Sequence, residues 1–190
     1  MVGVSSITFP ASASKLAEGP TAVKKALDII TSSPGNIGAY HGIQIEDGKT
    51  AYFSAVWSDS AAHSAFLKAD THAAFTAALT ELADGPLQAA YIEVSSDPAK
   101  AFGSPVVEGA HFTTKDTDDA PFKALSAALE PIAPHAWGRN VENPNHVIFF
   151  VGWESLEANK AAAEKLGDVF GKAMAASDNI KVAHSTLTKA

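Results

Sequence analysis

The sequence predicts an α+β fold built from two βαββαβ units, whose antiparallel sheets together form one barrel. The main observation is an internal repeat: a short apolar strand ends in tryptophan and leads into a helix at Trp57 and again, 96 positions later, at Trp153. A second observation is that a turn signal precedes each of these strands, so that each closes a hairpin. Because helices cover one face of such a sheet, the other apolar face must be buried, and the second unit can bury it.

In the first unit the hairpin turn is predicted at 46–48, and the helix after the tryptophan begins near Asp59, whose side-chain oxygen can cap it. The apolar positions Phe66, Ala69 and Ala73 predict the buried face of this helix. We expect the remaining elements of this unit to be strands at 3–9, 37–45, 52–57 and 87–94, and an earlier helix at 16–30.

The second unit has the same order of elements. Its hairpin turn is predicted at 143–145, and Ser155 is the expected helix cap. The earlier helix begins at Pro121, where a fixed φ suits the first turn, and ends near Pro131. We expect strands at 106–113, 135–141, 148–153 and 181–187, a first helix at 121–129, and a buried helix face at Ala162, Leu166, Val169 and Ala173.

The repeat also sets the expected domain organisation. Upstream of the tryptophans, the pair Ala39-Tyr40 aligns with Ala136-Trp137. The stretch 95–105 is rich in Ser, Pro, Ala and Gly, a composition typical of a linker. We therefore expect a first repeat at 1–96 that holds the site, a linker at 97–105 and a structural second repeat at 106–190.

Composition limits the classes of partner. The net charge is −7 and Arg139 is the only arginine, so nucleic acid and anionic substrates are disfavoured. The absence of cysteine excludes disulfides and thiolate metal sites, and the seven histidines show no metal-binding spacing. No phosphate-binding glycine motif and no apolar run of membrane-spanning length occurs. We expect a cytoplasmic protein with no metal, no cofactor, no membrane association and no nucleic-acid partner.

The sequence resembles the dimeric α+β barrel superfamily, in particular its antibiotic-biosynthesis-monooxygenase (ABM domain) and stress-responsive branches. The residues that carry the resemblance are YFSAVW at 52–57, the helix start SDSAAH at 58–63 and FLKADTHAAF at 66–75. The resemblance implies two ferredoxin-like repeats fused into one pseudo-dimeric α+β barrel. Members include cofactor-free monooxygenases, polyketide cyclases, isomerases, heme-degrading enzymes and small-molecule binders, so the fold does not choose a function.

The resemblance also supplies the expected catalytic residue. His72 stands at the place where related cyclases carry a histidine general base, and a near-neutral pKa suits an imidazole to that task. We expect Trp57 to seal the junction between strand and helix, and His63 to face solvent. A role for His111 and heme ligation by a single histidine are weaker alternatives. The expected binding residues are Tyr40, His41, Tyr52, Trp57 and Tyr91.

The second copy departs from this pattern. It places Asp168, Trp137, Phe149 and His184 approximately where the first copy has His72, Tyr40, Tyr52 and Tyr91. Because Trp and Phe fill space, we expect the second copy to be closed and any cavity between helix and sheet to touch His72.

Two hypotheses follow, and a third is weaker. The first is a cofactor-independent enzyme of monooxygenase, cyclase or isomerase type that acts on a neutral aromatic or polyketide-like molecule, with His72 as base. The alternative is a non-catalytic small-molecule-binding or stress-associated barrel protein, and the third is a heme binder. The pseudo-dimer is intramolecular, and the sequence leaves a further homodimer open.

Overall fold

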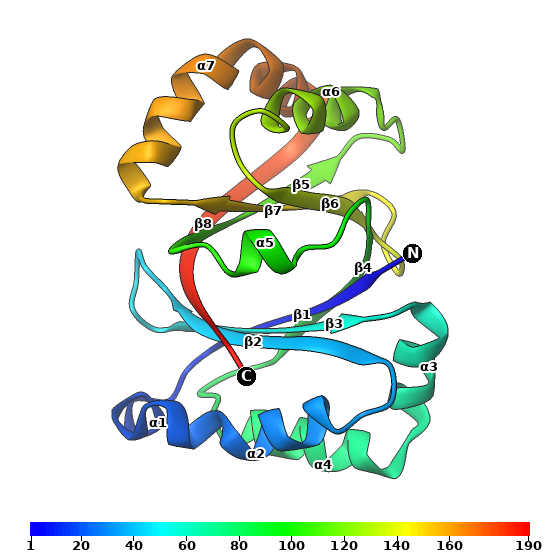
Figure 1. Ribbon diagram of the computed structural model, residues 1–190, viewed down its shortest axis with the longest axis vertical. Helices are drawn as coiled ribbons and strands as arrows, with labels where there is room; N and C mark the ends of the chain where they lie inside the picture. The colour runs from blue at the N-terminus through cyan, green and yellow to red at the C-terminus, as the bar shows by residue number, and fades with distance from the viewer.

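A computed structural model describes residues 1–190, except for the side chain of Pro20. The first half of the chain runs from strand β1 to strand β4 (Figure 1). Its elements are β1 (Gly3–Pro10), α1 (Ala13–Glu18), α2 (Pro20–Thr31), β2 (Asn36–Gln44), β3 (Thr50–Trp57), α3 (Ser60–Lys68), α4 (Asp70–Thr80) and β4 (Gln88–Val94).

A short helix, α5 (Ala99–Phe102), leads into the second half. The order of elements then repeats. At each of the two places where the first half has a pair of helices, the second half has a single helix. The elements of the second half are β5 (Val106–Thr114), α6 (Ala120–Leu129), β6 (His135–Asn140), β7 (His146–Trp153), α7 (Leu156–Ala175) and β8 (Ser177–Lys189).

The eight strands form one closed antiparallel barrel in the order β1-β3-β2-β8-β5-β7-β6-β4. Each half supplies four neighbouring strands, and the halves meet where β2 pairs with β8 and β4 pairs with β6. Closure leaves no sheet edge exposed. The expectation of an α+β fold with one pseudo-dimeric barrel is confirmed.

The two junctions between the halves are closely packed at equivalent glycines. A Cβ atom on Gly42 would collide with the carbonyl oxygen of Thr186, and one on Gly138 would collide with that of Glu93. Gly42 and Gly138 lie 96 positions apart, the same spacing as the two tryptophans. Glycine is therefore required at both junctions by the close approach of the neighbouring backbone.

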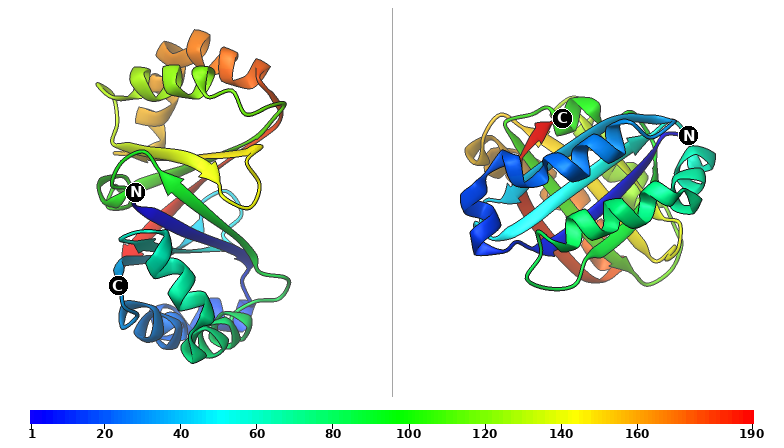
Figure 2. Two further views of the ribbon diagram at one scale, coloured as in Figure 1. Left: turned by 90° about the vertical axis from the view of Figure 1, so that its right-hand side faces the viewer. Right: turned by 90° about the horizontal axis from the view of Figure 1, so that it is seen from below.

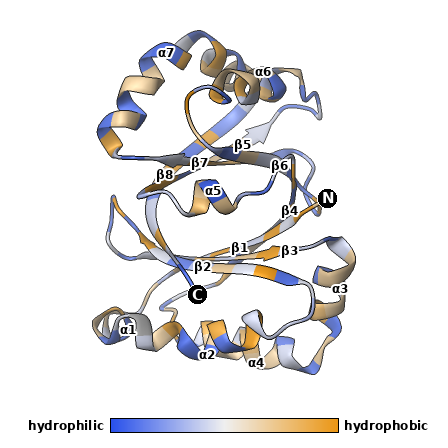
Figure 3. Ribbon diagram, in the orientation of Figure 1, coloured by the Kyte–Doolittle hydropathy of each residue, from blue (hydrophilic) through white to orange (hydrophobic). Residues whose placement is uncertain are grey.

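The hydrophobic core has three layers. Helices α1 to α4 cover the outer face of the first four strands, and α6 and α7 cover that of the second four (Figures 1 and 2). Apolar residues recur on the strands and on both helix layers (Figure 3). A cluster around Phe53, Trp57 and Leu79 fills the first helix layer, and one around Phe112, Phe149 and Trp153 fills the second.

The third layer is the barrel interior, and the segment predicted as a linker helps to fill it. Helix α5 buries Phe102 to 1% exposure, and its ring lies 5.0 Å from the rings of both Tyr40 and Phe150. The side chain of Asp97 accepts a hydrogen bond from the backbone N–H of Ala99 at 2.9 Å, at the start of this helix. The segment is therefore part of the core as well as a connection.

Both predicted helices of the first half are interrupted. The helix expected at 16–30 is broken at Gly19, where φ is +62°, and a new helix starts at the following proline. The helix after Trp57 is broken at Ala69, which has an extended backbone. Ala69 and Ala73 are exposed as a result, so their prediction as a buried face was wrong, whereas Phe66 is buried as expected.

The predicted alignment of the two hairpins was wrong by one residue. Strand pairing places Tyr40 opposite Ser54 and Ala136 opposite Phe150, so Ala136 is the equivalent of Tyr40. Trp137 is then the equivalent of His41. A register irregularity lies between Asn36 and Gly38 in β2, at the end away from the hairpin turn, so the spacing of 96 positions between β2 and β6 holds from Gly38 onward.

The predicted helix caps are confirmed. The side chain of Asp59 accepts from the backbone N–H of Ala62 at 2.8 Å, and that of Ser155 accepts from Ala158 at 3.2 Å. Within the described residues, the structure contains no helix with the length and apolar character needed to cross a membrane.

Candidate functional site

The two tryptophans make equivalent hydrogen bonds to the first strand of their own half. The indole N–H of Trp57 donates to the hydroxyl of Ser5 at 2.9 Å, and that of Trp153 donates to the Glu108 carboxylate at 3.0 Å. The strand registers make Ser5 and Glu108 equivalent, because β1 and β5 pair with β3 and β7 in the same way. Each bond therefore holds a helix-facing tryptophan over the sheet, next to a cavity.

The first of these cavities, here called the His72 cavity, has a volume of about 120 Å³ and lies between β1, β3 and β4 and helices α3 and α4. His63 stacks on Tyr91 with ring centroids 3.9 Å apart and planes 2° apart. His72, in the first turn of α4, meets the ring of Phe66 edge-on at 5.3 Å. The prediction that His63 faces solvent was wrong, because its ring is half-buried on Tyr91.

The electrostatics of this cavity favour neutral groups. Burial lowers the pKa of His63, an effect that Glu142 opposes and His72 reinforces. Burial also raises the pKa of Tyr91 to about 12, with help from Glu93 and Asp59. The Tyr91 hydroxyl is buried and has no hydrogen-bond partner within the described part of the chain. At neutral pH the cavity is thus lined by the neutral imidazole of His63 and by the ring of a protonated Tyr91.

A larger cavity of the first half does not touch His72. This space, the His41 cavity, has a volume of about 260 Å³ and lies between α1 and α2 and strands β2, β3 and β8. His41 faces it, and burial lowers the pKa of that imidazole. In the second half the equivalent Trp137 stacks on Phe149 with centroids 5.4 Å apart, so the same space is filled. The expectation that any cavity between helix and sheet touches His72 was wrong.

The predicted site residues therefore fall into three places. His72, Trp57 and Tyr91 line the His72 cavity, whereas His41 lines the His41 cavity. Tyr40 points into the barrel interior, where burial raises its pKa. A joint action of Tyr40 with His72 is thereby excluded, because the two lie on opposite faces of the sheet.

Tyr52 lies between the barrel interior and the His41 cavity. It contributes to the lining of both spaces, and its hydroxyl donates to the Gln44 side chain at 3.3 Å. Burial raises its pKa to about 12, and the nearby carboxylates of Glu46 and Asp47 act in the same direction.

The second half is not closed. A cavity of about 160 Å³, here called the Glu108 cavity, lies between its sheet and helices α6 and α7. Glu108 and Asn159 are its polar lining residues, and Trp153, Phe149 and Phe170 are among its apolar ones. This site was not predicted from the sequence, although the carboxylate of Glu108, directly after two valines of a strand, was a visible signal.

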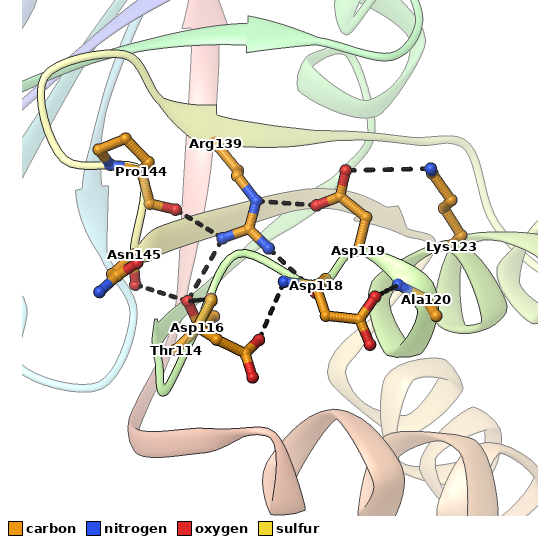
Figure 4. A network of polar contacts seen from close by, with 9 residues as sticks. All are labelled: Thr114, Asp116, Asp118, Asp119, Ala120, Lys123, Arg139, Pro144 and Asn145. Atoms are coloured by element: carbon orange, nitrogen blue, oxygen red, sulfur yellow. Dashed lines mark hydrogen bonds and ion pairs between the residues drawn. The ribbon is translucent and has the colours of Figure 1, made fainter.

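The single arginine belongs to a structural network (Figure 4). Arg139 donates to the Asp119 carboxylate at 2.8 Å and to the backbone carbonyl oxygen of Asp118 at 3.0 Å. Its guanidinium also lies 5.8 Å from the centre of the Phe122 ring. The network ties the loop before α6 to the hairpin that contains Pro144. The guanidinium of Arg139 thus donates hydrogen bonds to carboxylate and carbonyl oxygens of neighbouring loops.

His111 belongs to the barrel interior. Its Nδ1 lies 3.1 Å from Nε2 of His146, and burial together with His146 and Lys181 lowers its pKa to about 4. The neighbouring interior cavity is only about 20 Å³. This pair is therefore a partly buried polar contact next to a cavity that is too small for a ligand.

No family model and no curated protein matches the sequence. Three solved structures match over nearly the whole chain. A proposed monooxygenase from Lactobacillus acidophilus NCFM has a TM-score of 0.70 and 15% identity, over 100% of this chain and 96% of that one. A proposed monooxygenase from Fusobacterium nucleatum has a TM-score of 0.75 and 14% identity, over 99% and 93%. An anthrone oxidase-like protein has a TM-score of 0.72 and 12% identity, over 98% and 91%.

At these identities the likeness is one of fold. The chain has the dimeric α+β barrel fold, with both halves of the barrel fused in one polypeptide, and the resemblance seen in the sequence is confirmed at that level.

Proposed function

We propose that the chain is a cofactor-independent enzyme that acts on a neutral aromatic molecule in the His72 cavity. The observation that carries the proposal is that His63, His72 and Tyr91 all line one cavity whose other walls are largely apolar. Titratable groups that converge on such a cavity are a common mark of an active site. Three solved structures that share the fold over nearly the whole chain are named as proposed monooxygenases or as anthrone oxidase-like, and these names describe oxidation reactions.

The size of the cavity sets how a substrate would enter. Its volume of about 120 Å³ is close to the roughly 150 Å³ that accommodates benzene in a protein interior. One edge of a flat aromatic molecule would therefore lie inside, and the rest would extend past the exposed residues Leu67 and Glu142.

In the proposed reaction His72 takes a proton from a phenol or an activated methylene. Tyr91 and the His63 ring that stacks on it form part of the cavity wall. For oxygenation of a methylene, dioxygen is the co-substrate. The carbon loses two hydrogens and gains one oxygen as a carbonyl, and the second oxygen leaves as water.

The test is oxygen consumption with anthrone as probe, followed together with anthraquinone absorbance. We expect His72→Ala to lower the rate by about 10²–10⁴-fold, the usual contribution of a positioned base. Asp168→Ala is the matched control in the second half, because Asp168 is exposed on α7, and it should keep the wild-type rate. A wild-type rate equal to that in buffer, or an unimpaired His72→Ala variant, would contradict the proposal.

The second candidate function is non-catalytic binding of a small apolar molecule in the His41 cavity. It is favoured by the volume of about 260 Å³ and a largely apolar lining. His41→Trp introduces the residue that fills the equivalent space in the second half. If this function is the true one, anthrone binds without turnover, His41→Trp abolishes the binding, and His72→Ala leaves it unchanged.

A further inference from the structure

We propose that the second half contains a separate binding site, the Glu108 cavity, for a small apolar molecule that carries a neutral hydroxyl group. In this site the carboxylate of Glu108 accepts a hydrogen bond from the hydroxyl group of the ligand. The aromatic and aliphatic walls of the cavity pack against the apolar part of the ligand. The site lies outside the His72 cavity and goes beyond the function proposed for the first half.

The cavity has the right size and lining. Its volume of about 160 Å³ matches the roughly 150 Å³ that holds one aromatic ring. Phe149, Phe170 and Leu166 form part of its apolar wall, and the carboxylate of Glu108 is at its polar side together with Asn159. A small apolar ligand with one polar group fits this distribution.

The hydrogen bonds of Glu108 are unevenly distributed between its two oxygens. The side chain is only 12% exposed, and a carboxylate so deeply buried needs donors. The Trp153 indole at 3.0 Å and the Asn159 amide at 2.5 Å both donate to Oε2. Among the described residues no donor reaches Oε1, although an ionised carboxylate has acceptor sites on both oxygens. Oε1 is therefore available to a ligand.

Tryptophan anchoring alone does not require this glutamate. In the first half the equivalent Trp57 is held by the hydroxyl of Ser5 at 2.9 Å. A serine would therefore satisfy the Trp153 indole equally well, without the cost of burying a carboxylate. The glutamate adds a charged acceptor at the cavity, and a ligand hydroxyl gives that acceptor a use.

The surrounding charges favour a neutral ligand over a cation. Nε2 of His184 lies 3.6 Å from Oε2 of Glu108, and Nδ1 of His184 donates to Glu46 at 2.6 Å. The Glu108 and Glu46 carboxylates raise the pKa of His184, against the effect of burial. The raised pKa favours the protonated form of His184, and a ligand cation would lie near that form and be repelled by it. A neutral O–H group forms a charge-assisted bond to the carboxylate without that repulsion.

The experiment is a titration of the ¹⁵N-labelled protein with 4-ethylphenol and, in parallel, with ethylbenzene. The indole N–H signals of Trp153 and Trp57 report on the Glu108 cavity and the His72 cavity separately, so failure of one proposal is distinguishable from failure of the other. We expect 4-ethylphenol to shift the Trp153 signal and to bind at least tenfold more tightly than ethylbenzene.

Two variants complete the test. Glu108→Gln should weaken 4-ethylphenol at the Trp153 signal by about tenfold and leave ethylbenzene unchanged. If the glutamine variant is unstable, Glu108→Ser replaces it in the test, because serine stands at the equivalent position of the first half. Glu154→Gln is the matched control, because this glutamate is exposed just before α7. Equal affinities of the two ligands for the wild-type protein, or a response of the Trp57 signal alone, would overturn the proposal.

Discussion

The two halves share one backbone plan and differ in the groups that surround its cavities. In both, the last residue of the third strand is a buried tryptophan that donates to the first strand. Around this bond the first half places His63 and Tyr91, and the second half places Asn159 and His184. The fold requires an acceptor on the first strand and leaves the neighbouring positions free, so one repeat can hold two different sites.

Each half also supplies a glutamate that contacts or lines a part of the other half. Glu46, beyond β2 of the first half, binds His184 of the second half. At the position 96 residues later, Glu142 of the second half lines the His72 cavity of the first half. Glu142 therefore borders the His72 cavity directly, whereas Glu46 is connected to the Glu108 cavity only through His184, which lies beside Glu108.

The largest expected effect concerns the tryptophans. Trp57 is 0% exposed and Trp153 is 5% exposed. Because large-to-small changes in a core leave cavities, Trp57→Ala and Trp153→Ala should each lower the free energy of unfolding by about 3–5 kcal/mol in denaturant titration. A loss below about 1 kcal/mol for either one would show that the two tryptophans are not equivalent.

The next effect concerns the junctions between the halves. Gly42→Ala and Gly138→Ala each place a methyl group against a backbone carbonyl of the neighbouring strand. We expect each to lower the free energy of unfolding by about 2–3 kcal/mol, as overpacking does. Gly171→Ala on α7, where a Cβ meets nothing within 4 Å, is the control and should be neutral or stabilising. Tolerance of alanine at either junction would contradict the packing described for it.

The last effect appears only at acidic pH and concerns His111, whose equivalent in the first half is Thr8. The folded pKa of His111 is lowered to about 4, so between about pH 6.5 and 4 the unfolded chain binds a proton that the folded chain does not. Stability should therefore fall as the pH falls through this window, by about 2–3 kcal/mol from this group. His111→Thr should remove that part of the pH dependence, as measured by urea titration at pH 7 and pH 4. Identical pH profiles would contradict it.

The sequence predicted the repeat, the helix caps and the barrel because these depend on local patterns. Asp59 and Ser155 cap their helices through contacts within three residues. The side of the sheet that Tyr40 faces was not predictable from the alternation of the strand alone, because it depends on the register with β3, in which Tyr40 pairs with Ser54. Glu108 was missed because the side chains that hold it, Trp153 and Asn159, lie 45 and 51 residues away along the chain.

The central claim is that an aromatic substrate binds in the His72 cavity of the first half. A crystal structure of the protein with bound anthrone tests it most directly. We predict that one ring edge lies between helix α3 and β4, with a substrate atom within hydrogen-bond distance of an imidazole nitrogen of His72. Anthrone bound instead in the His41 cavity, with the His72 cavity unoccupied, would contradict the account.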